Sequence, residues 1–352
     1  MPEENAIKLT QYSHGAGCGC KIAPQVLEEI LKTESPQNQI ANLLVGNSSK
    51  DDAAVYQIND KEAIIATTDF FTPIVDDPFT FGKVAAANAI SDVYAMGGSP
   101  VLALAILGWP VETLSVESAQ QVLAGAREVC KEAGIPLAGG HSIDSKEPIF
   151  GLSVNGRVPL TNLKKNDTAQ NGDLILMTKP LGVGILSTAS KRGKLTPEDL
   201  KTLEDQLTIL NKLGEKLGSV AEVTAMTDVT GFGLGGHLIE MAEAAQLSAR
   251  LEYNKIQKIN GLDKYLEQNI LPDATFRNWN AMGDKIDFKN ADHALEGFKL
   301  LPDPQTNGGL LIAVRPEGLK IVQDILQTEG YDNFIQPIGK FVEQRGKVIE
   351  IL

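Results

Sequence analysis

The stretch AANAISDVYAMGG, residues 86–98, places an acidic side chain inside an apolar helical pattern that ends at two glycines. The apolar positions with helical spacing are Phe79, Val84, Ala87, Ile90 and Val93. This spacing predicts a helix from Phe79 to Met96, which Gly97 and Gly98 terminate. The apolar run VLALAILGW, residues 101–109, follows at once and predicts a buried strand.

Further from this stretch, strand and helix patterns alternate through both halves of the chain, which predicts an α/β (α+β) fold in two domains. Residues 159–172 are polar and rich in Lys and Asn, as inter-domain connections often are. We therefore expect a flexible glycine-rich segment over 1–23, an N-terminal domain over 24–160 and a C-terminal domain over 161–352.

The composition of the chain indicates which kinds of molecule it does not readily bind. The chain has 352 residues, with 32 Lys and Arg against 45 Asp and Glu, which gives a net charge of −13. Such a charge disfavours nucleic acid and anionic membrane surfaces. The longest fully apolar run, Val101 to Leu107, is far shorter than the roughly 20 residues of a membrane helix. The 3 cysteines form no disulfide framework and the N-terminus lacks a signal peptide pattern, so we expect a cytoplasmic protein.

Several aspartates lie where strands or helices are expected to end: Asp51, Asp52, Asp69 and Asp228. Asp92 instead lies within the expected helix, one turn after Asn88 and on the same face. Its neighbours are apolar, and a bound cation removes the cost of burying a carboxylate among them. Magnesium held by carboxylates together with substrate phosphates fits this set. Helix capping and turns are the alternative interpretation for any one of these aspartates.

Three glycine clusters leave alternatives open. Gly231, Gly233 and Gly236 match the dinucleotide pattern GxGxxG, with Glu252 near the place of a ribose-binding acid, although Asp228 would repel a bare pyrophosphate. The clusters AGGHS (138–142) and DPQTNGG (303–309) suit either phosphate-binding turns or plain tight turns.

The N-terminal run GAGCGCK, residues 15–21, combines Cys18 and Cys20 with Lys21. A neighbouring positive charge lowers the pKa of a thiol, so we expect a reactive cysteine here. A zinc site or another thiol-based metal site is the competing interpretation, but no second ligand pair has the required spacing for zinc. Cys130 falls in an amphipathic helix and is expected in the core.

Seven strings together resemble the selenophosphate synthetase (selenide, water dikinase) family, which is part of the aminoimidazole ribonucleotide synthetase-like group of ATP-binding enzymes. They are LTQYSHGAGCGCK, KDDAAVY, TTDFF, NAISDVYAMGG, LAGGHSID, MTDVTGFGLGGHL and DPQTNGGLL, and the resemblance runs from about Leu9 to Leu352. It implies a homodimer whose N-terminal strands form a shared barrel. It also implies an ATP-dependent phosphotransferase that makes selenophosphate, AMP and phosphate from selenide, ATP and water, as the selenium donor for selenocysteine and selenonucleosides.

By motif position, the resemblance makes Cys18 and Lys21 the catalytic pair. It implies Mg²⁺ ligands at Asp52, Asp92 and Asp228. The implied nucleotide contacts are Lys21, Ser49, Lys50, Asp51, Asp69 and Asp92, together with Gly140, His141 and Ser142 reached across the dimer. A monovalent cation such as K⁺ and a selenium-delivery protein are further expectations from the resemblance.

Overall fold

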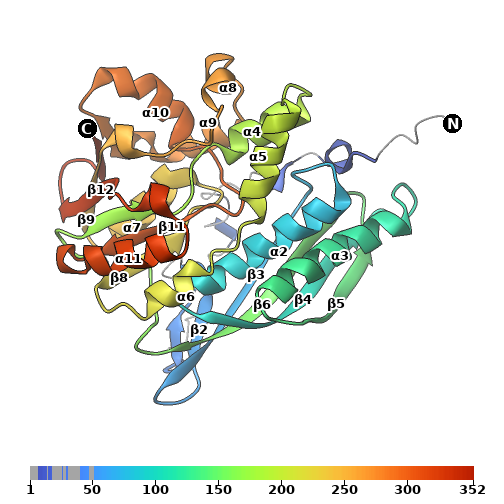
Figure 1. Cartoon of the computed structure of the whole chain (residues 1–352), viewed down its shortest axis with the longest axis horizontal. Helices are drawn as coiled ribbons and strands as arrows, with labels where there is room; N and C mark the ends of the chain where they lie inside the picture. Colours follow the sequence, from blue (N-terminus) through green and yellow to red (C-terminus); the bar gives the residue numbers. More distant parts are fainter. Residues whose placement is uncertain (1–6, 14, 18–25, 27–28, 31–39, 47–50) are drawn as a thin grey trace.

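The structure is a computed structural model of the whole chain, and it describes residues 7–13, 15–17, 26, 29–30, 40–46 and 51–352. It has two β-sheets (Figure 1). The first has the strand order β1-β2-β3-β6-β4-β5. Its strands are β1 (Leu43–Val45), β2 (Ala54–Gln57), β3 (Glu62–Phe71), β4 (Ser99–Trp109), β5 (Leu137–Asp144) and β6 (Ile149–Pro159). A 3-10 helix, η1 (Leu9–Tyr12), precedes them.

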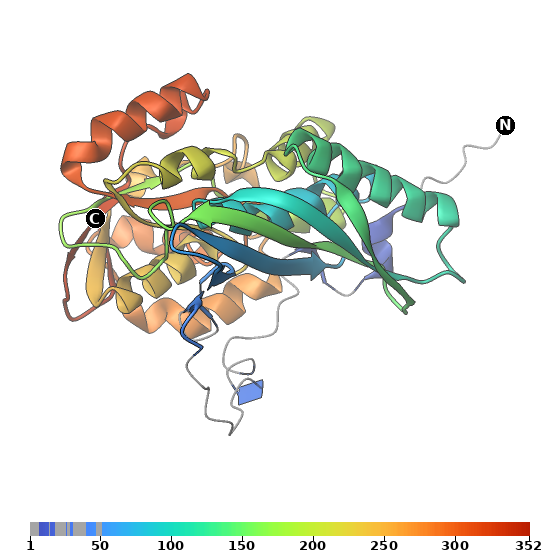
Figure 2. The ribbon, with the colours of Figure 1, turned by 90° about the horizontal axis from the view of Figure 1, so that it is seen from below.

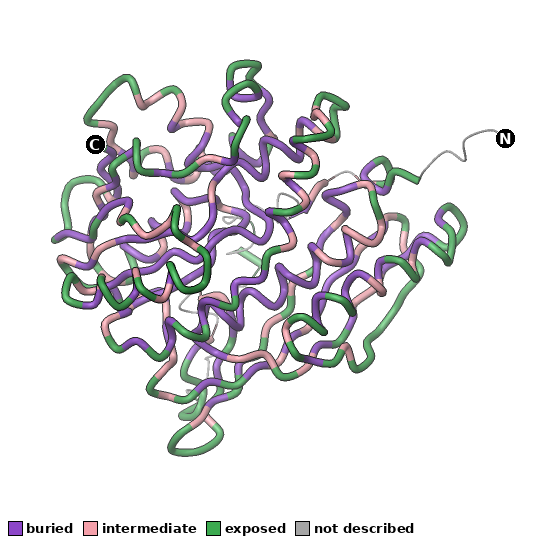
Figure 3. The backbone as a smooth tube through the Cα atoms, in the orientation of Figure 1, coloured by how far each residue is buried: buried purple, intermediate pink, exposed green. Residues whose placement is uncertain are grey.

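Two long helices, α2 (Pro78–Ala95) and α3 (Val116–Glu132), pack on one face of this sheet (Figure 2). Asp77 caps α2 by accepting a hydrogen bond from the backbone N–H of Thr80 (2.7 Å), and Pro78 fills the first turn. The helix is buried along most of its length (Figure 3). Because α2 is enclosed on nearly all sides, any polar side chain on it must find a partner within the protein.

The opposite face of the first sheet carries exposed apolar side chains. They are Tyr56, Ile64, Phe70, Leu104 and Ile143. The strand register places all five on one face. Tyr56 pairs with Ile64, and Phe70 is aligned across the sheet with Ile106 and His141. Leu104 and Ile143 each lie two residues from one of these positions, so their side chains point to the same side. A large apolar surface of this kind typically marks an interface.

The second sheet has the order β10-β13-β9-β12-β7-β11-β8. Its strands are β7 (Leu174–Met177), β8 (Val223–Asp228), β9 (Leu247–Leu251), β10 (Ile286–Phe288), β11 (Leu310–Val314), β12 (Gly339–Glu343) and β13 (Ile349–Ile351). The helices are α4 (Val183–Lys191), α5 (Pro197–Thr208), α6 (Leu213–Gly218), α7 (Gly233–Ala244), α8 (Asp263–Glu267), α9 (Asp273–Met282), α10 (Ala294–Leu300) and α11 (Leu319–Thr328). Both α5 and β8 contact α2, so this sheet and its helices pack directly against the first domain.

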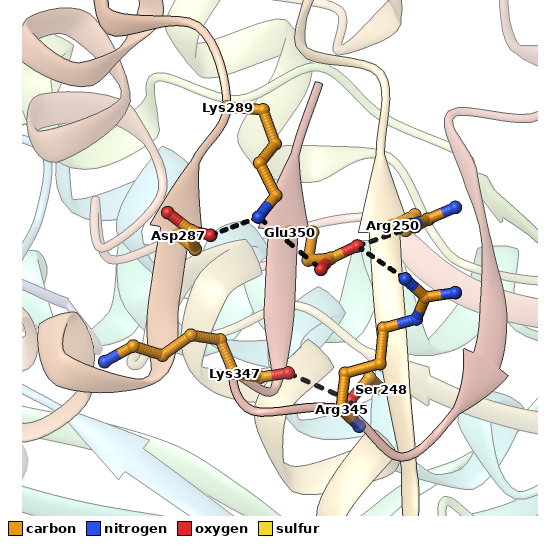
Figure 4. Close-up of polar contacts among 7 residues, drawn as sticks. All are labelled: Ser248, Arg250, Asp287, Lys289, Arg345, Lys347 and Glu350. Carbon is orange, nitrogen blue, oxygen red and sulfur yellow. Dashed lines mark hydrogen bonds and ion pairs between the residues drawn. The ribbon is translucent and has the colours of Figure 1, made fainter.

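A cluster of ion pairs links the strands at one edge of the second sheet (Figure 4). Glu350 of β13 accepts a hydrogen bond from Arg250 Nε of β9 at 2.6 Å, and Arg345 and Lys289 each lie 3.7 Å from its carboxylate. The Arg250 hydrogen bond is the main reason that the pKa of Glu350 lies below its usual value. The cluster joins β9, β13 and β10, so it has a structural role.

Two expected elements differ from the structure. AGGHS is part of strand β5 and forms no turn, because Gly140 lies where an added Cβ would stand 2.1 Å from Ala105 O of the neighbouring strand. The sequence near 196–217 predicts one helix, which the structure breaks at residues 209–212 into α5 and α6. The boundary between residues 160 and 161 falls between β6 and β7 and stays a prediction, as does the flexible segment over 1–23. Within the described residues, no helix is long and apolar enough to cross a membrane.

Candidate active site

Helix α2 presents three buried polar residues on one face, at positions i, i+3 and i+4. Asn88 Nδ2 donates to Asp69 Oδ2 of β3 at 2.7 Å, and Ser91 Oγ donates to Asp228 Oδ2 at the end of β8 at 2.5 Å. Asp92 Oδ2 accepts from Thr67 Oγ1 of β3, also at 2.5 Å. Thus one helical face gathers aspartates from both domains.

Asp52, Asp92 and Asp228 bring three negative charges together. Burial is the largest cause that raises the pKa of Asp52 well above its usual value, and the charges of Asp228 and then Asp92 raise it further. A hydrogen bond from Thr227 Oγ1 to Asp52 Oδ1 (2.7 Å) acts in the opposite direction. Asp52 Oδ2 is buried and has no hydrogen-bond partner among the described residues. A cation at this oxygen would satisfy it and offset the mutual repulsion of the carboxylates.

These carboxylates do not form a finished metal cage. Within the part of the chain that the structure describes, no three His, Cys, Asp or Glu side chains make a ready-made metal site. This is compatible with Mg²⁺, because proteins usually bind it through one or two carboxylates, waters and substrate phosphates. The donor set therefore fits a metal that arrives with a phosphate ligand.

Behind the carboxylates lies a buried polar node that sequence reasoning missed. Lys179, which follows β7, donates from Nζ to Ile209 O (2.8 Å) and Asn307 O (2.9 Å). The backbone N–H of Asn307 donates to Asn88 Oδ1 at 2.7 Å, and Asn211 Nδ2 donates to Ser91 Oγ at 2.7 Å. The node therefore fixes the two α2 residues that hold Asp69 and Asp228.

Part of this node was foreseeable. Ser91 lies next to Asp92 and three residues after Asn88 within an apolar helix, so helical spacing alone could have singled it out. The partners of Lys179 and Asn307 lie at least 30 residues away along the chain, and no local pattern indicates them.

The remaining expected site residues fall in three groups. Asp51 Oδ1 accepts from the backbone N–H of Asn166 (2.8 Å), and Asp69 is inside β3 rather than after it. Gly140, His141 and Ser142 lie on edge strand β5. Asp69 and Gly140 are aligned in the sheet, but strands β6 and β4 lie between them. At about 4.8 Å per strand, the two residues are roughly 14 Å apart. Asp69 and the three β5 residues therefore do not meet within one chain. Cys18, Cys20, Lys21, Ser49 and Lys50 lie outside the described residues.

The dinucleotide interpretation of the GxGxxG pattern is wrong. It needs two adjacent parallel strands joined by a helix. Among the described residues β8 pairs only with β11, which is antiparallel, and α7 leads to β9, which three strands separate from β8. The glycines serve packing instead: an added Cβ at Gly233 would stand 2.5 Å from Leu301 O. Glu252 is paired with Lys255 at 2.9 Å.

In the loop 303–309, two backbone N–H groups already have partners within the protein. The backbone N–H of Gln305 donates to Thr230 O, and that of Asn307 to Asn88. Cys130 is in the core as expected, and burial raises the pKa of its thiol to about 11.

Comparison with known proteins assigns this architecture to a class. The model of the N-terminal domain of AIR synthase related proteins matches residues 50–158, and that of the C-terminal domain matches residues 170–351. A thiamine-monophosphate kinase from Stenotrophomonas maltophilia K279a superposes with a TM-score of 0.64 at 18% identity, over 94% of this chain and 96% of that chain. Hydrogenase maturation protein HypE in complex with ATP gives 0.63 at 18%, over 86% of each chain. The fold is therefore the two-domain AIR synthase-like fold.

Closer relatives narrow the class to a family. A selenide, water dikinase from Aeromonas hydrophila is 53% identical over 349 residues, and one from Pseudomonas aeruginosa is 52% identical over 347 residues. Each alignment covers 99% of both chains. The chain belongs to the selenide, water dikinase family.

Proposed function

We propose that this enzyme makes selenophosphate from selenide, ATP and water, and releases AMP and phosphate. The observation that carries the proposal is the buried carboxylate cluster around Asp52, which suits a metal-bound triphosphate, in a chain so similar to curated dikinases. The product serves as selenium donor for selenocysteine and selenonucleosides.

Mg²⁺ is the metal that we propose for the cluster, held by Asp52, Asp92 and Asp228. When bound, it supplies the positive charge that lets an acidic protein accept a triphosphate. Ser91 and Thr227 orient two of these carboxylates through the hydrogen bonds given above. A monovalent cation such as K⁺ is also part of the proposal and rests on family resemblance alone.

The proposed nucleotide site extends beyond one chain. Ser49, Lys50, Asp51 and Asp69 would contact the nucleotide from the chain that holds the metal, and Gly140, His141 and Ser142 from a second copy. The exposed apolar face of the first sheet supports such a homodimer, in which the two faces would close a shared barrel.

Cys18 and Lys21 complete the proposed chemistry. Lys21 would offset charge at the γ-phosphate, and Cys18 would either act as a nucleophile at that phosphate or hold and orient selenide as a temporary ligand. A thiol with this task must stay reduced, so we place the reaction in the cytosol. A protein that delivers selenium to Cys18 is a further proposed partner.

The decisive measurement is product analysis with ATP, selenide and Mg²⁺. We expect AMP, phosphate and selenophosphate, the last detected by phosphorus NMR; ADP as the sole stable product would contradict the proposal. Asp228→Asn should lower the rate on the order of 100-fold, because several kcal/mol of metal-derived charge stabilisation is lost. Asp205→Asn, on the exposed side of α5 beside Lys201, is the matched control and should leave the rate unchanged. Full activity of Cys18→Ser would remove the catalytic role of that residue.

A further inference from the structure

Residues 9–13 and 15–17, here called the leader segment, are anchored at three places. The first anchor is the loop between β3 and α2. Leu9 is fully buried, and its backbone N–H donates to Asp76 O at 3.3 Å. Thr10 Oγ1 donates to Asp76 Oδ1 at 2.5 Å. Because Asp77 is the N-cap of α2, this anchor attaches the segment to the start of the helix that gathers the carboxylates.

The second anchor comes from the other domain. Lys191, the last residue of α4, donates from Nζ to Ser13 O at 3.0 Å and to Gly15 O at 3.2 Å. An ammonium group has three donors, and two of them meet carbonyls of this one segment. Ser13 Oγ also donates to Gly15 O at 2.9 Å. Lys191 therefore joins both described parts of the leader segment to the C-terminal domain.

The third anchor is Gly17, the residue before Cys18. Its backbone N–H donates to Thr72 O at 3.1 Å, and its φ is +50°. An added Cβ would stand 2.5 Å from Thr306 Oγ1 and 2.6 Å from Ile74 Cδ1. Thr306 precedes Asn307, which holds Asn88, so the segment ends against the loop that organises the carboxylate site.

We propose that Lys191 is a positioning residue: by holding Ser13 and Gly15 it ties the leader segment to the C-terminal domain and sets the course of the described chain up to Gly17, beside the carboxylate site. The inference rests on the proposed role of Cys18. Lys191 is exposed, and hydrogen bonds at the surface add little to global stability. Its loss should therefore affect the placement of the segment much more than folding.

The test compares Lys191→Met with wild type at saturating ATP. The rate of selenophosphate formation should fall about tenfold, the equivalent of losing roughly one charge-assisted hydrogen bond. The KM for ATP should stay within about twofold, because the carboxylate cluster is untouched. Lys191→Arg should restore most of the rate, since a guanidinium can also donate to both carbonyls.

Two further variants sharpen the comparison. Lys194→Met removes an exposed lysine three residues further along and should behave as wild type. Thr10→Val removes the hydroxyl that binds Asp76 while keeping the side-chain shape, and should lower the rate in the same way as Lys191→Met. Equal rates for Lys191→Met, Lys194→Met and wild type would overturn the proposal.

A second readout does not need turnover. In a Cys20→Ser background, mass spectrometry can follow the alkylation rate of Cys18, which should differ between Lys191→Met and the Lys194→Met control if Lys191 positions the segment. An unchanged alkylation rate would contradict the proposal. If wild type formed no selenophosphate, the proposed function would fail, while the alkylation comparison would still decide whether Lys191 positions the segment.

Discussion

Lys179 is a lysine that the protein removes almost completely from water, at 2% exposure. Burial lowers its pKa from the usual 10.5 to about 7, while the charge of Asp228 acts in the opposite direction. Between pH 7 and 10 the unfolded chain therefore binds more protons at this residue than the folded one. Its contribution to the free energy of unfolding must rise with pH across that window.

Replacing Lys179 with Met removes this contribution. We therefore compare the unfolding free energy of the wild type with that of Lys179→Met. The wild-type value minus the variant value should grow from pH 7 to pH 9, by at most about 1.4 kcal/mol per pH unit. Urea unfolding at pH 7, 8 and 9 measures it, with Lys320→Met on exposed α11 as the control. A difference that stays constant with pH would show that Lys179 titrates normally.

Gly17 offers a second single-residue prediction. Alanine there would meet both a positive φ and the Thr306 and Ile74 side chains, so the end of the leader segment must move. We expect Gly17→Ala to lower selenophosphate formation on the order of 100-fold, the scale of a misplacement of about 1 Å.

Gly193 supplies the matched control for Gly17. Its φ is +66°, but an added Cβ would meet no atom within 4 Å. Gly193→Ala should therefore cost roughly 1 kcal/mol of stability and no activity. Equal activity in the two variants would show that the contacts of Gly17 are unimportant.

At the scale of elements, α2 and α3 touch backbone to backbone. An added Cβ would stand 1.9 Å from Val122 O at Gly82, and 1.9 Å from Phe79 O at Gly125. Gly125→Ala must push the helices apart, at a cost of roughly 1–3 kcal/mol. Because α2 carries Asn88, Ser91 and Asp92, the affinity for Mg²⁺-ATP should fall as well.

Thermal unfolding and nucleotide titration test this together. Gln121→Ala, on the exposed side of α3, should change neither quantity. A Gly125→Ala protein that melts at the wild-type temperature would contradict the close helix contact.

Sequence patterns predicted α2 and β4 to within about two residues, because each has a long and strong apolar pattern. The patterns failed where contacts between distant parts of the chain determine the secondary structure. The expected helix over 196–217 breaks at Ile209, whose carbonyl binds Lys179 and Asn307 instead of continuing the helix. AGGHS suggested a turn because of its glycines, whereas their small size serves strand pairing with β4.

In the candidate site, too, local patterns predicted some residues, and distant contacts determined the others. Asp92 was identified from its apolar neighbours, and its burial is confirmed. The partners of Ser91 lie 137 and 120 residues away along the chain, at Asp228 and Asn211, so only the fold reveals them.

At the scale of the whole molecule, the exposed face of the first sheet predicts association. Leu104→Lys places a charge among apolar side chains there, and we expect it to shift a dimer toward monomer. Sedimentation equilibrium measures the change. Leu295→Lys changes a leucine that is still more exposed, on α10 of the other domain, and should leave the mass unchanged. A Leu104→Lys protein that associates like wild type would place the interface elsewhere.

The buried node also has a consequence for synthesis on the ribosome. Asn88 and Ser91 emerge early, but their partners at Asn211, Asp228 and Asn307 are made 120 to 219 residues later. Until then the polar face of α2 lacks those partners and must stay hydrated. The nascent first domain therefore cannot close its catalytic face by itself, and a pause in translation before residue 307 would prolong the time that this face is open to chaperones.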